Sequence, residues 1–85
     1  MFTVRLAKQP QKFLKKSEKE LHDRLCQKLK DLAQNPFPTD VKRVVGKEEK
    51  VFRVRVGDYR IQYEVIYAEN LVMVTEIEKR PRTYD

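Results

Sequence analysis

The chain has 85 residues, of which 40% are hydrophobic and 38% charged, and 19 lysines and arginines outnumber 13 acidic residues to give a net charge of +6. This size and apolar content suffice for one domain, residues 1–85, with one layer of helices on one sheet. The single cysteine excludes an internal disulfide, and no apolar run approaches the roughly 20 residues of a membrane helix. We therefore expect a cytoplasmic domain, with no metal site, whose charge suits nucleic acid, an acidic protein or an anionic membrane.

The first half of the chain predicts a strand and two helices. Residues 2–7 alternate apolar and more polar side chains, as a half-buried strand does, and Pro10 suits the first turn of a following helix. A second helix is indicated by leucines at spacings of three and four, which are Leu21, Leu25, Leu29 and Leu32. Ser17 and Glu20 are expected to form its capping box, and the proline-containing segment 35–38 is expected to end it.

From residue 41 onward the apolar period changes to two, which predicts strands at residues 43–46, 51–56, 59–67 and 71–78. Gly57 and Asp58 form a two-residue hairpin signal. Residues 68–70 form a second turn, in which Asn70 tolerates a positive φ. The element order is therefore β-α-α-β-β-β-β. We expect an α+β fold in which an antiparallel helical hairpin packs on one face of a small, mainly antiparallel twisted sheet.

The two-residue turn fixes a register, because it pairs Val56 with Tyr59. Six apolar residues then share one face, which must carry the helices: Phe52, Val54, Val56, Tyr59, Ile61 and Tyr63. Tyr67 is expected on the same core-facing side. A three-residue second loop predicts four pairs between the last two strands: Val65 with Met73, Tyr63 with Thr75, Ile61 with Ile77 and Arg60 with Glu78.

The opposite, polar face collects basic side chains, because Arg53, Arg55, Arg60 and Gln62 have the other parity and Arg80 follows beyond Glu78. Arg55 faces Arg60, and like charges directly opposite on a sheet repel by a few tenths of a kcal/mol up to about 1 kcal/mol. An unfavourable local arrangement of this kind often indicates a functional site. The alternative is an ordinary solvated sheet face that acidic neighbours neutralise, namely Glu64, Glu76 and Glu78.

The basic residues also change in type along the chain. Lysines dominate before Val51, whereas the later basic residues are mostly arginines, namely Arg53, Arg55, Arg60, Lys79, Arg80 and Arg82. The planar guanidinium group suits bidentate contact with phosphate, while lysine acts as a point charge. We interpret the C-terminal arginines as a phosphate site and the N-terminal lysines as general electrostatics. Phe37, between two prolines, is interpreted as a loop anchor at the edge of the core.

Residues 51–65 resemble the central hairpin of RelE-type toxins, most specifically in the step from Gly57 through Asp58 and Tyr59 to Arg60. Three further features resemble this branch of the RelE/ParE superfamily in their order. They are the lysine-rich helical hairpin, the segment 40–46 before a short strand, and the terminal motif 79–84. The resemblance covers nearly the whole chain.

The resemblance implies the toxin of a type II toxin–antitoxin system. Such a toxin is a ribosome-dependent endoribonuclease that cleaves messenger RNA and inhibits translation. Its partners would be a cognate antitoxin, the ribosome and mRNA, with no cofactor and no membrane. The catalytic roles would fall to Arg53, Arg55, Arg60, Arg80 and Tyr84. Substrate binding would involve Gln62, Lys79 and Arg82. The arginines would align the ribose 2′-OH with the adjacent phosphate and stabilise the charge that develops there.

Two departures from the pattern bear on the chemistry. RelE proteins often carry lysines where this chain has Arg53 and Arg55, and arginine cannot act as a base because its pKa is about 12.5 or higher. The pattern therefore does not identify the general base. Tyr84, which could orient the 2′-OH, stack on a base or itself act as base, lies next to the last residue. Two alternatives are a ParE-type toxin that binds DNA gyrase and an inactive RNA-binding member of the superfamily.

Overall fold

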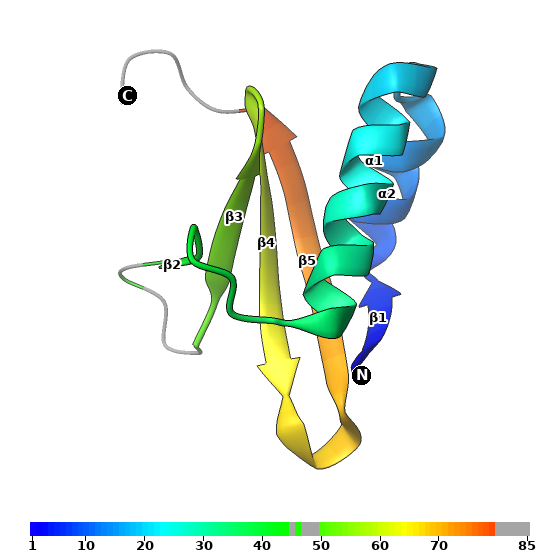
Figure 1. Ribbon diagram of the computed structural model, residues 1–85. Coiled ribbons are helices and arrows are strands. Elements are labelled where there is room, and N and C mark those ends of the chain that lie inside the picture. Colours follow the sequence, from blue (N-terminus) through cyan, green and yellow to red (C-terminus); the bar gives the residue numbers. More distant parts are fainter. Residues whose placement is uncertain (45, 47–49, 80–85) are drawn as a thin grey trace.

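The computed structural model describes residues 1–44, 46 and 50–79 (Figure 1). Along the chain it contains β1 (Thr3–Leu6), α1 (Lys8–Lys16), α2 (Lys19–Gln34), β2 (Lys42–Arg43), β3 (Phe52–Val56), β4 (Tyr59–Ile66), the 3-10 turn η1 (Tyr67–Glu69) and β5 (Leu71–Lys79). This is the predicted element order. The strand predicted at residues 43–46 corresponds to β2, which begins one residue earlier, and the Val44 amide donates to the carbonyl of Val51 at 2.7 Å.

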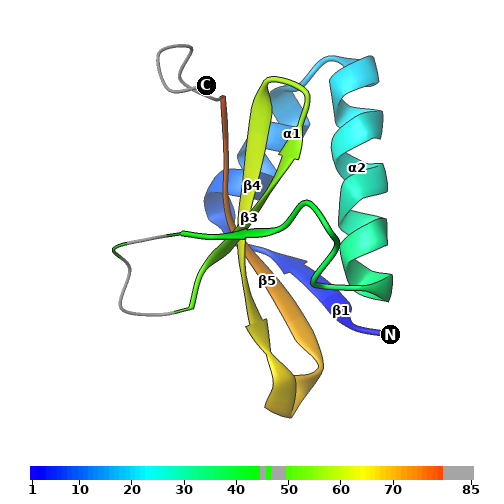
Figure 2. The same cartoon turned by 60° about the vertical axis from the view of Figure 1, so that its left-hand side comes forward.

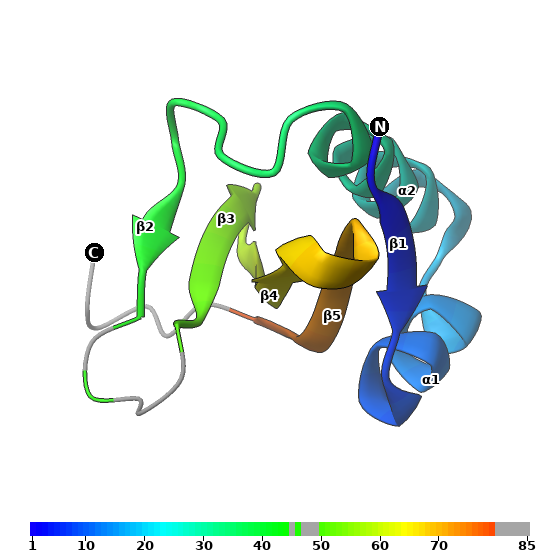
Figure 3. The ribbon, with the colours of Figure 1, turned by 90° about the horizontal axis from the view of Figure 1, so that it is seen from below.

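The described strands form one sheet in the order β1-β5-β4-β3-β2. β1 runs parallel to β5, and the other neighbouring strands are antiparallel. Both helices lie against one face of this sheet (Figures 1 and 2). Seen from below, β1 lies beside the helices and β2 lies at the opposite edge (Figure 3). The predicted α+β architecture is confirmed. Within the described residues, no helix combines the length and apolar character needed to cross a membrane.

The core lies between the helices and the inward face of β3, β4 and β5. The leucines of α2 supply the helical side, since Leu25, Leu29 and Leu32 are buried as their spacing predicts, while Leu21 packs at the margin. The strands supply Val54, Ile61, Tyr63, Val72, Val74 and Ile77, all at most 1% exposed. The face assignment drawn from the hairpin register therefore holds for the central strands.

Tyr63 joins the core to the segment that ends α2. Its ring is buried, and its hydroxyl donates a hydrogen bond to the carbonyl of Pro36. Burial raises the pKa of the Tyr63 phenol well above its ordinary value. Phe37 lies in the same segment and packs edge-on against Phe52, with ring centroids 5.1 Å apart. This contact agrees with the interpretation of Phe37 as a loop anchor.

Gln9 occupies the edge of β5 beyond the end of β1. Its side-chain amide donates to the carbonyl of Ile77 at 2.7 Å and accepts from the amide of the same residue at 2.8 Å. One side chain thus imitates the peptide group that a longer β1 would supply. The contact ties α1 to β5 at the residue that precedes Glu78.

The capping box predicted for α2 is wrong. Ser17 instead ends α1, because its backbone amide donates to Leu14 and its hydroxyl donates to the carbonyl of Phe13 at 2.7 Å. The N-cap position of α2 is occupied by Glu18, which makes no side-chain capping bond. The two helices follow each other so closely that the Ser17 hydroxyl is used by the last turn of α1.

The register predicted between β4 and β5 is correct at one end and wrong at the other. Ile61 pairs with Ile77 and Arg60 with Glu78 as expected, but Tyr63 pairs with Val74 and Val65 with Val72. The connection has four residues, because Tyr67 joins the turn and Asn70 adopts a left-handed conformation with φ of 53°. A bulge beyond Gln62 compensates for the extra residue and keeps the apolar side chains inward. Tyr67, predicted to be core, is 67% exposed for the same reason.

Candidate functional site

Three of the four arginines predicted to cluster, Arg53, Arg55 and Arg60, lie on the β3–β4 hairpin with the parity that faces away from the helices. In the β3–β4 hairpin Arg55 lies directly across from Arg60, and Arg53 lies across from Gln62. The turn that sets this register has Gly57 at a φ of 59°, which a glycine adopts without strain. Four of the predicted site residues are therefore brought together by a single local turn.

Arg60 is held by the carboxylate of Glu78 on β5. Its Nη2 lies 3.0 Å from Glu78 Oε1, and the side chains are 20% and 31% exposed. Gln62 donates from Nε2 to the same oxygen at 3.1 Å. Two donors from β4 thus contact the same carboxylate oxygen. This arrangement shows that Arg60 and Gln62 can jointly bind an anionic oxygen, and it fixes the orientation of the Arg60 guanidinium.

The Nε atom of Arg60 is in a less favourable environment than its Nη2 atom. Its Nε is buried and has no hydrogen-bond partner within the described part of the chain. A buried donor without a partner costs about 1–3 kcal/mol. The structure thus accepts a local penalty at the centre of the cluster, in addition to the repulsion between Arg55 and Arg60.

Arg53 and Arg55 have less counter-charge than Arg60. Arg53 is half-buried between Lys42 of β2 and Gln62 of β4, and Arg55 is exposed. Neither makes an ion pair with a carboxylate among residues 1–44, 46 and 50–79. The alternative interpretation, an ordinary polar face whose charges are neutralised by acidic neighbours, therefore describes Arg60 but not Arg53 or Arg55.

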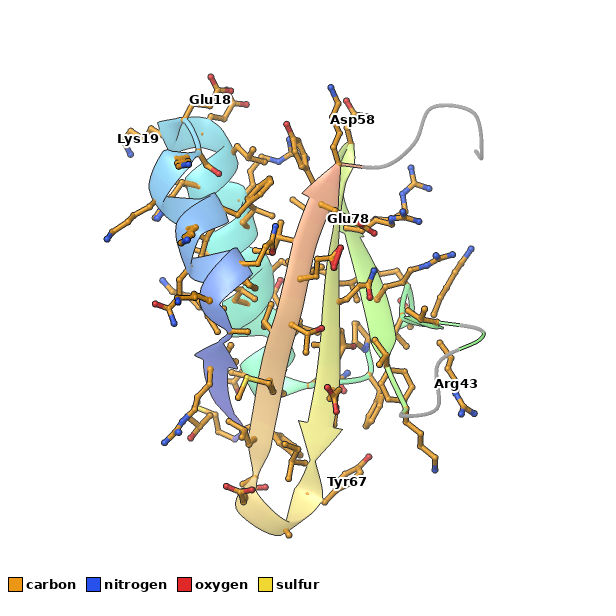
Figure 4. All side chains as sticks on the ribbon, turned by 180° about the vertical axis from the view of Figure 1, so that it is seen from behind. Glu18, Lys19, Arg43, Asp58, Tyr67 and Glu78 are labelled. Carbon is orange, nitrogen blue, oxygen red and sulfur yellow. The ribbon has the colours of Figure 1, made fainter. Side chains whose placement is uncertain are left out.

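The remaining predicted residues lie apart from the cluster or outside the described ranges. Lys79 ends β5 opposite Tyr59, so strand alternation directs it to the side that carries the helices. Arg80, Arg82 and Tyr84 lie outside the described residues. Figure 4 shows Glu78 and Asp58 toward the same end of the sheet, with Tyr67 at the other end. The cluster therefore lies near the hairpin turn.

Arg24 of α2 was not predicted as a site residue, yet its guanidinium lies over the turn next to the cluster. A Cβ added at Gly57 would lie 2.9 Å from Arg24 Nη2. The sequence gives no sign of this contact, because a solvent-facing arginine on a helix is usually only a surface charge. The contact depends on how α2 is placed against the tip of the hairpin.

Two hollows flank the hairpin on the side of the helices. One, of about 320 Å³, lies between α2 and β3 and includes Arg24, Arg55 and Gly57 in its lining. The other, of about 460 Å³, has an apolar floor of Phe13, Leu21 and Tyr59 and contains no member of the cluster. Within the described residues, no group of three or more histidine, cysteine or acidic side chains could hold a metal ion.

Several known proteins with a related sequence or structure are toxins or toxin–antitoxin complexes. The sequence model of a family described as the ParE toxin of the type II toxin–antitoxin system parDE matches residues 2–84. A candidate toxin, RelE1, of Methanocaldococcus jannaschii is 32% identical over 76% of this chain and 91% of its own length. A chain of the archaeal RelE–RelB complex from Pyrococcus horikoshii has a TM-score of 0.82 at 27% identity, covering 95% of this chain and 97% of that one. A chain of the intact Escherichia coli RelBE complex is alike in fold, with a TM-score of 0.81 at 19% identity, covering 96% and 100%.

Proposed function

Because the chain belongs to the RelE/ParE superfamily of toxins from type II toxin–antitoxin systems, we propose that it is a ribosome-dependent endoribonuclease that cleaves messenger RNA in the cytoplasm. The observation that carries the proposal is the pairing of Arg55 with Arg60 on the uncovered sheet face, beside Arg53. These positions hold positive charge at a cost in stability. A phosphate of the substrate would offset that cost.

In the proposed reaction the ribose 2′ oxygen forms a bond to the adjacent phosphorus as the bond from phosphorus to the 5′ oxygen of the next nucleotide breaks. The 2′-OH gives up its proton, and the departing 5′ oxygen takes one up. Arg60, with Arg55 and Arg53, would align the phosphate and stabilise its additional negative charge. Gln62 would donate to a phosphate oxygen, as it now donates to Glu78.

The C-terminal residues complete the proposal. Arg80 and Tyr84 are proposed as catalytic residues that contact the scissile phosphate and the 2′-OH, and Arg82 and Lys79 as RNA-binding residues. The described arginines supply charge and orientation, but their high pKa prevents them from accepting the 2′-OH proton. Tyr84 is the residue on which we place that part of the reaction, provided that nearby arginines depress its pKa.

The proposed regulator is a cognate antitoxin protein. Two of the solved relatives are complexes, described as archaeal RelE–RelB and intact E. coli RelBE. An acidic segment of such a partner would be attracted to the exposed guanidinium groups and would keep phosphate from them. We propose no cofactor and no membrane partner.

The proposal can be tested by translating a reporter message in a purified system and mapping its cut sites by primer extension. The wild-type protein should cut the message only when ribosomes are present. Arg60→Ala should abolish cleavage while the thermal melting curve stays cooperative, because Arg60 lies on the uncovered face. Lys30→Ala, an exposed α2 substitution with the same loss of charge, is the matched control and should cut normally. Full activity of Arg60→Ala would contradict the site.

A second candidate is inhibition of DNA gyrase, which the description of the matching family model as a ParE toxin favours. A supercoiling assay with purified gyrase separates the two functions. Inhibited supercoiling with intact messages would overturn the ribonuclease proposal. Normal supercoiling together with cut messages would support it.

A further inference from the structure

The end of the Arg24 guanidinium, on α2, lies against the tip of the β3–β4 hairpin. The position that a Cβ would take at Gly57 lies 2.9 Å from Arg24 Nη2, 3.2 Å from Nη1 and 3.4 Å from Cζ. A side chain at residue 57 would meet this flexible end of Arg24 and displace it. Gly57 also has a φ of 59°, which a glycine adopts without strain.

The Arg24 guanidinium has unused hydrogen-bonding capacity. Among the described residues no carboxylate pairs with it, whereas its neighbours on α2 are engaged: Lys28 contacts Asp40 at 3.0 Å, and Lys19 contacts Asp23 at 2.9 Å. Arginine presents five N–H donors in a rigid fork. A charged fork that is positioned by packing and not by a counter-ion is prepared to receive an anion.

The hollow beside Arg24 runs along an open stretch of the sheet edge. It measures about 320 Å³ and lies between α2 and the end of β3, with Arg55, Val56 and Gly57 in its lining. β2 pairs with β3 at Phe52 and Arg53, and within the described part of the chain no strand pairs with the later residues of β3 on that side. In an antiparallel ladder closed by the pair Val56–Tyr59, the backbone N–H of Arg55 points away from β4 toward this edge.

The charges in this hollow are unevenly distributed. Arg24 and Arg55 are at the end near the hairpin turn. The one acidic lining residue, Asp31, lies seven residues after Arg24. The third basic lining residue, Lys28, is already paired with Asp40 at 3.0 Å. Seven residues of helix span about 10 Å. An anion is therefore favoured at the hairpin end, between the two guanidinium groups, and disfavoured at the other end.

We infer that this groove between α2 and β3 binds a second backbone phosphate of the RNA, with Arg24 and Arg55 as its ligands. The inference rests on the proposed function, and it extends the site around the edge of the sheet. Arg55 belongs to both surfaces, because it faces Arg60 in the hairpin and also lines the groove. We expect the scissile phosphate of the RNA to lie on Arg60. If the RNA then continues past the hairpin turn, its next phosphate lies beside Arg24. Arg24 is thus a positioning residue for the reaction.

The test measures binding of a short RNA with 2′-O-methyl groups, which cannot be cleaved, by fluorescence anisotropy over a series of salt concentrations. Arg24→Ala should weaken binding about tenfold, because a charged hydrogen bond is lost. It should also reduce the slope of log affinity against log salt by about 0.7, the value for one single-strand phosphate contact. Lys30→Ala removes the same charge elsewhere on α2 and should change the slope by less. Arg24→Lys should keep the slope and lose part of the affinity, since lysine is not bidentate.

The Gly57 contact provides an independent arm. Gly57→Ala should displace the guanidinium and lower RNA affinity as Arg24→Ala does, and the double variant should be no weaker than either single one. Gly46→Ala is the matched control for backbone strain, because Gly46 also has a positive φ, of 90°, but has nothing within 4 Å of an added Cβ. It should leave RNA affinity unchanged. Additive losses in the double variant would overturn the coupling between Arg24 and the turn.

The outcomes also separate this inference from the proposed function. A wild-type protein that binds and cleaves RNA, with Arg24→Ala no weaker than Lys30→Ala, would overturn the groove and leave the ribonuclease proposal intact. A wild-type protein that neither binds nor cleaves RNA would overturn both. A poly-glutamate peptide serves as the acidic-protein probe. If Arg24→Ala weakens its binding and leaves RNA affinity unchanged, the groove belongs to a protein ligand and the inference is wrong.

Discussion

The two faces of the β3–β4 hairpin have adjacent residues in opposite environments. Val54 is 1% exposed and Ile61 is fully buried, whereas the next residue on each strand toward the turn, Arg55 and Arg60, faces away from the helices. The helix-covered face is filled with apolar side chains and the hydrogen-bonded ring of Tyr63. The uncovered face opposes two arginines and leaves a buried guanidinium nitrogen without a described partner.

This contrast indicates that one face stabilises the fold while the other carries a cost in stability, as the proposed RNA site on that face would require. A chain of this size buries a smaller fraction of its surface than a larger domain does, and its folded state has few kcal/mol to spare. The unfavourable charges lie on the residues of the two strands that face away from the core. The same hairpin can therefore form the core with one face and the proposed RNA site with the other. Substitutions one residue apart should therefore have effects of different kinds.

The largest effect on stability is expected for Ile61→Ala. The side chain is fully buried among the α2 leucines and the β5 valines. Removing it leaves a cavity and should lower the free energy of unfolding by about 3 kcal/mol. Urea unfolding followed by circular dichroism measures this as a lower midpoint. Arg60→Ala, at the preceding residue, should shift the midpoint by less than a third as much. Equal losses in the two variants would contradict the division between the faces.

A smaller loss is expected for Tyr63→Phe, which removes the hydroxyl that donates to the carbonyl of Pro36. The buried carbonyl is then unsatisfied, so the free energy of unfolding should fall by about 1–2 kcal/mol at neutral pH.

The same variant should also change the alkaline behaviour of the protein. The pKa of Tyr63 is raised above its unfolded value of 10.0, so the folded protein retains the phenol proton after the unfolded chain has lost it. The wild type should therefore lose stability as the pH rises above 10, and Tyr63→Phe should lose less. Unfolding midpoints at neutral pH and at about pH 11 measure this difference. Tyr67→Phe, at an exposed ring, should behave like the wild type, and an unchanged alkaline loss in Tyr63→Phe would refute the assignment.

The sequence predicts the two faces because their origin is local. The turn at Gly57 and Asp58 permits one register, and that register fixes the parity of every residue from Phe52 to Tyr63. The spacing of the leucines likewise locates α2. The same argument brings Arg53, Arg55, Arg60 and Gln62 together before any tertiary contact is known.

The sequence fails where a structure depends on a choice between local alternatives or on packing at a distance. The connection before β5 takes four residues where three were expected, and the bulge that compensates has no sequence signature. Ser17 could serve either helix, and it bonds to the earlier one. The position of Arg24 over Gly57 depends on the packing of α2 against the hairpin, which no local pattern encodes.

Glu78→Gln tests how much the carboxylate that pairs with Arg60 contributes to the uncovered face. The substitution keeps an acceptor for Gln62 but removes the charge that pairs with Arg60. Because both side chains are partly exposed, the free energy of unfolding should fall by only about 0.5–1 kcal/mol. The affinity for uncleavable RNA should rise a few fold, since a competing anion is gone. Glu69→Gln, in the turn at the other end of β5, is the control with the same loss of charge. A fall in RNA affinity would mean that orienting Arg60 matters more than neutralising it.

The smallest expected effect has the opposite sign. Arg55→Thr removes one of two like charges that face each other across the hairpin and introduces a residue suited to strands. The free energy of unfolding should rise by a few tenths of a kcal/mol, while RNA affinity falls.

Salt provides the internal control for Arg55→Thr, because about 1 M salt shortens the screening length to about 3 Å and should remove most of the gain. Urea midpoints at low and high salt measure both quantities in one series. A loss of stability at low salt would mean that the aliphatic stem of Arg55 contributes more by packing than its charge costs. The uncovered face would then not be assembled at the expense of stability, and the contrast between the two faces would reduce to one of polarity.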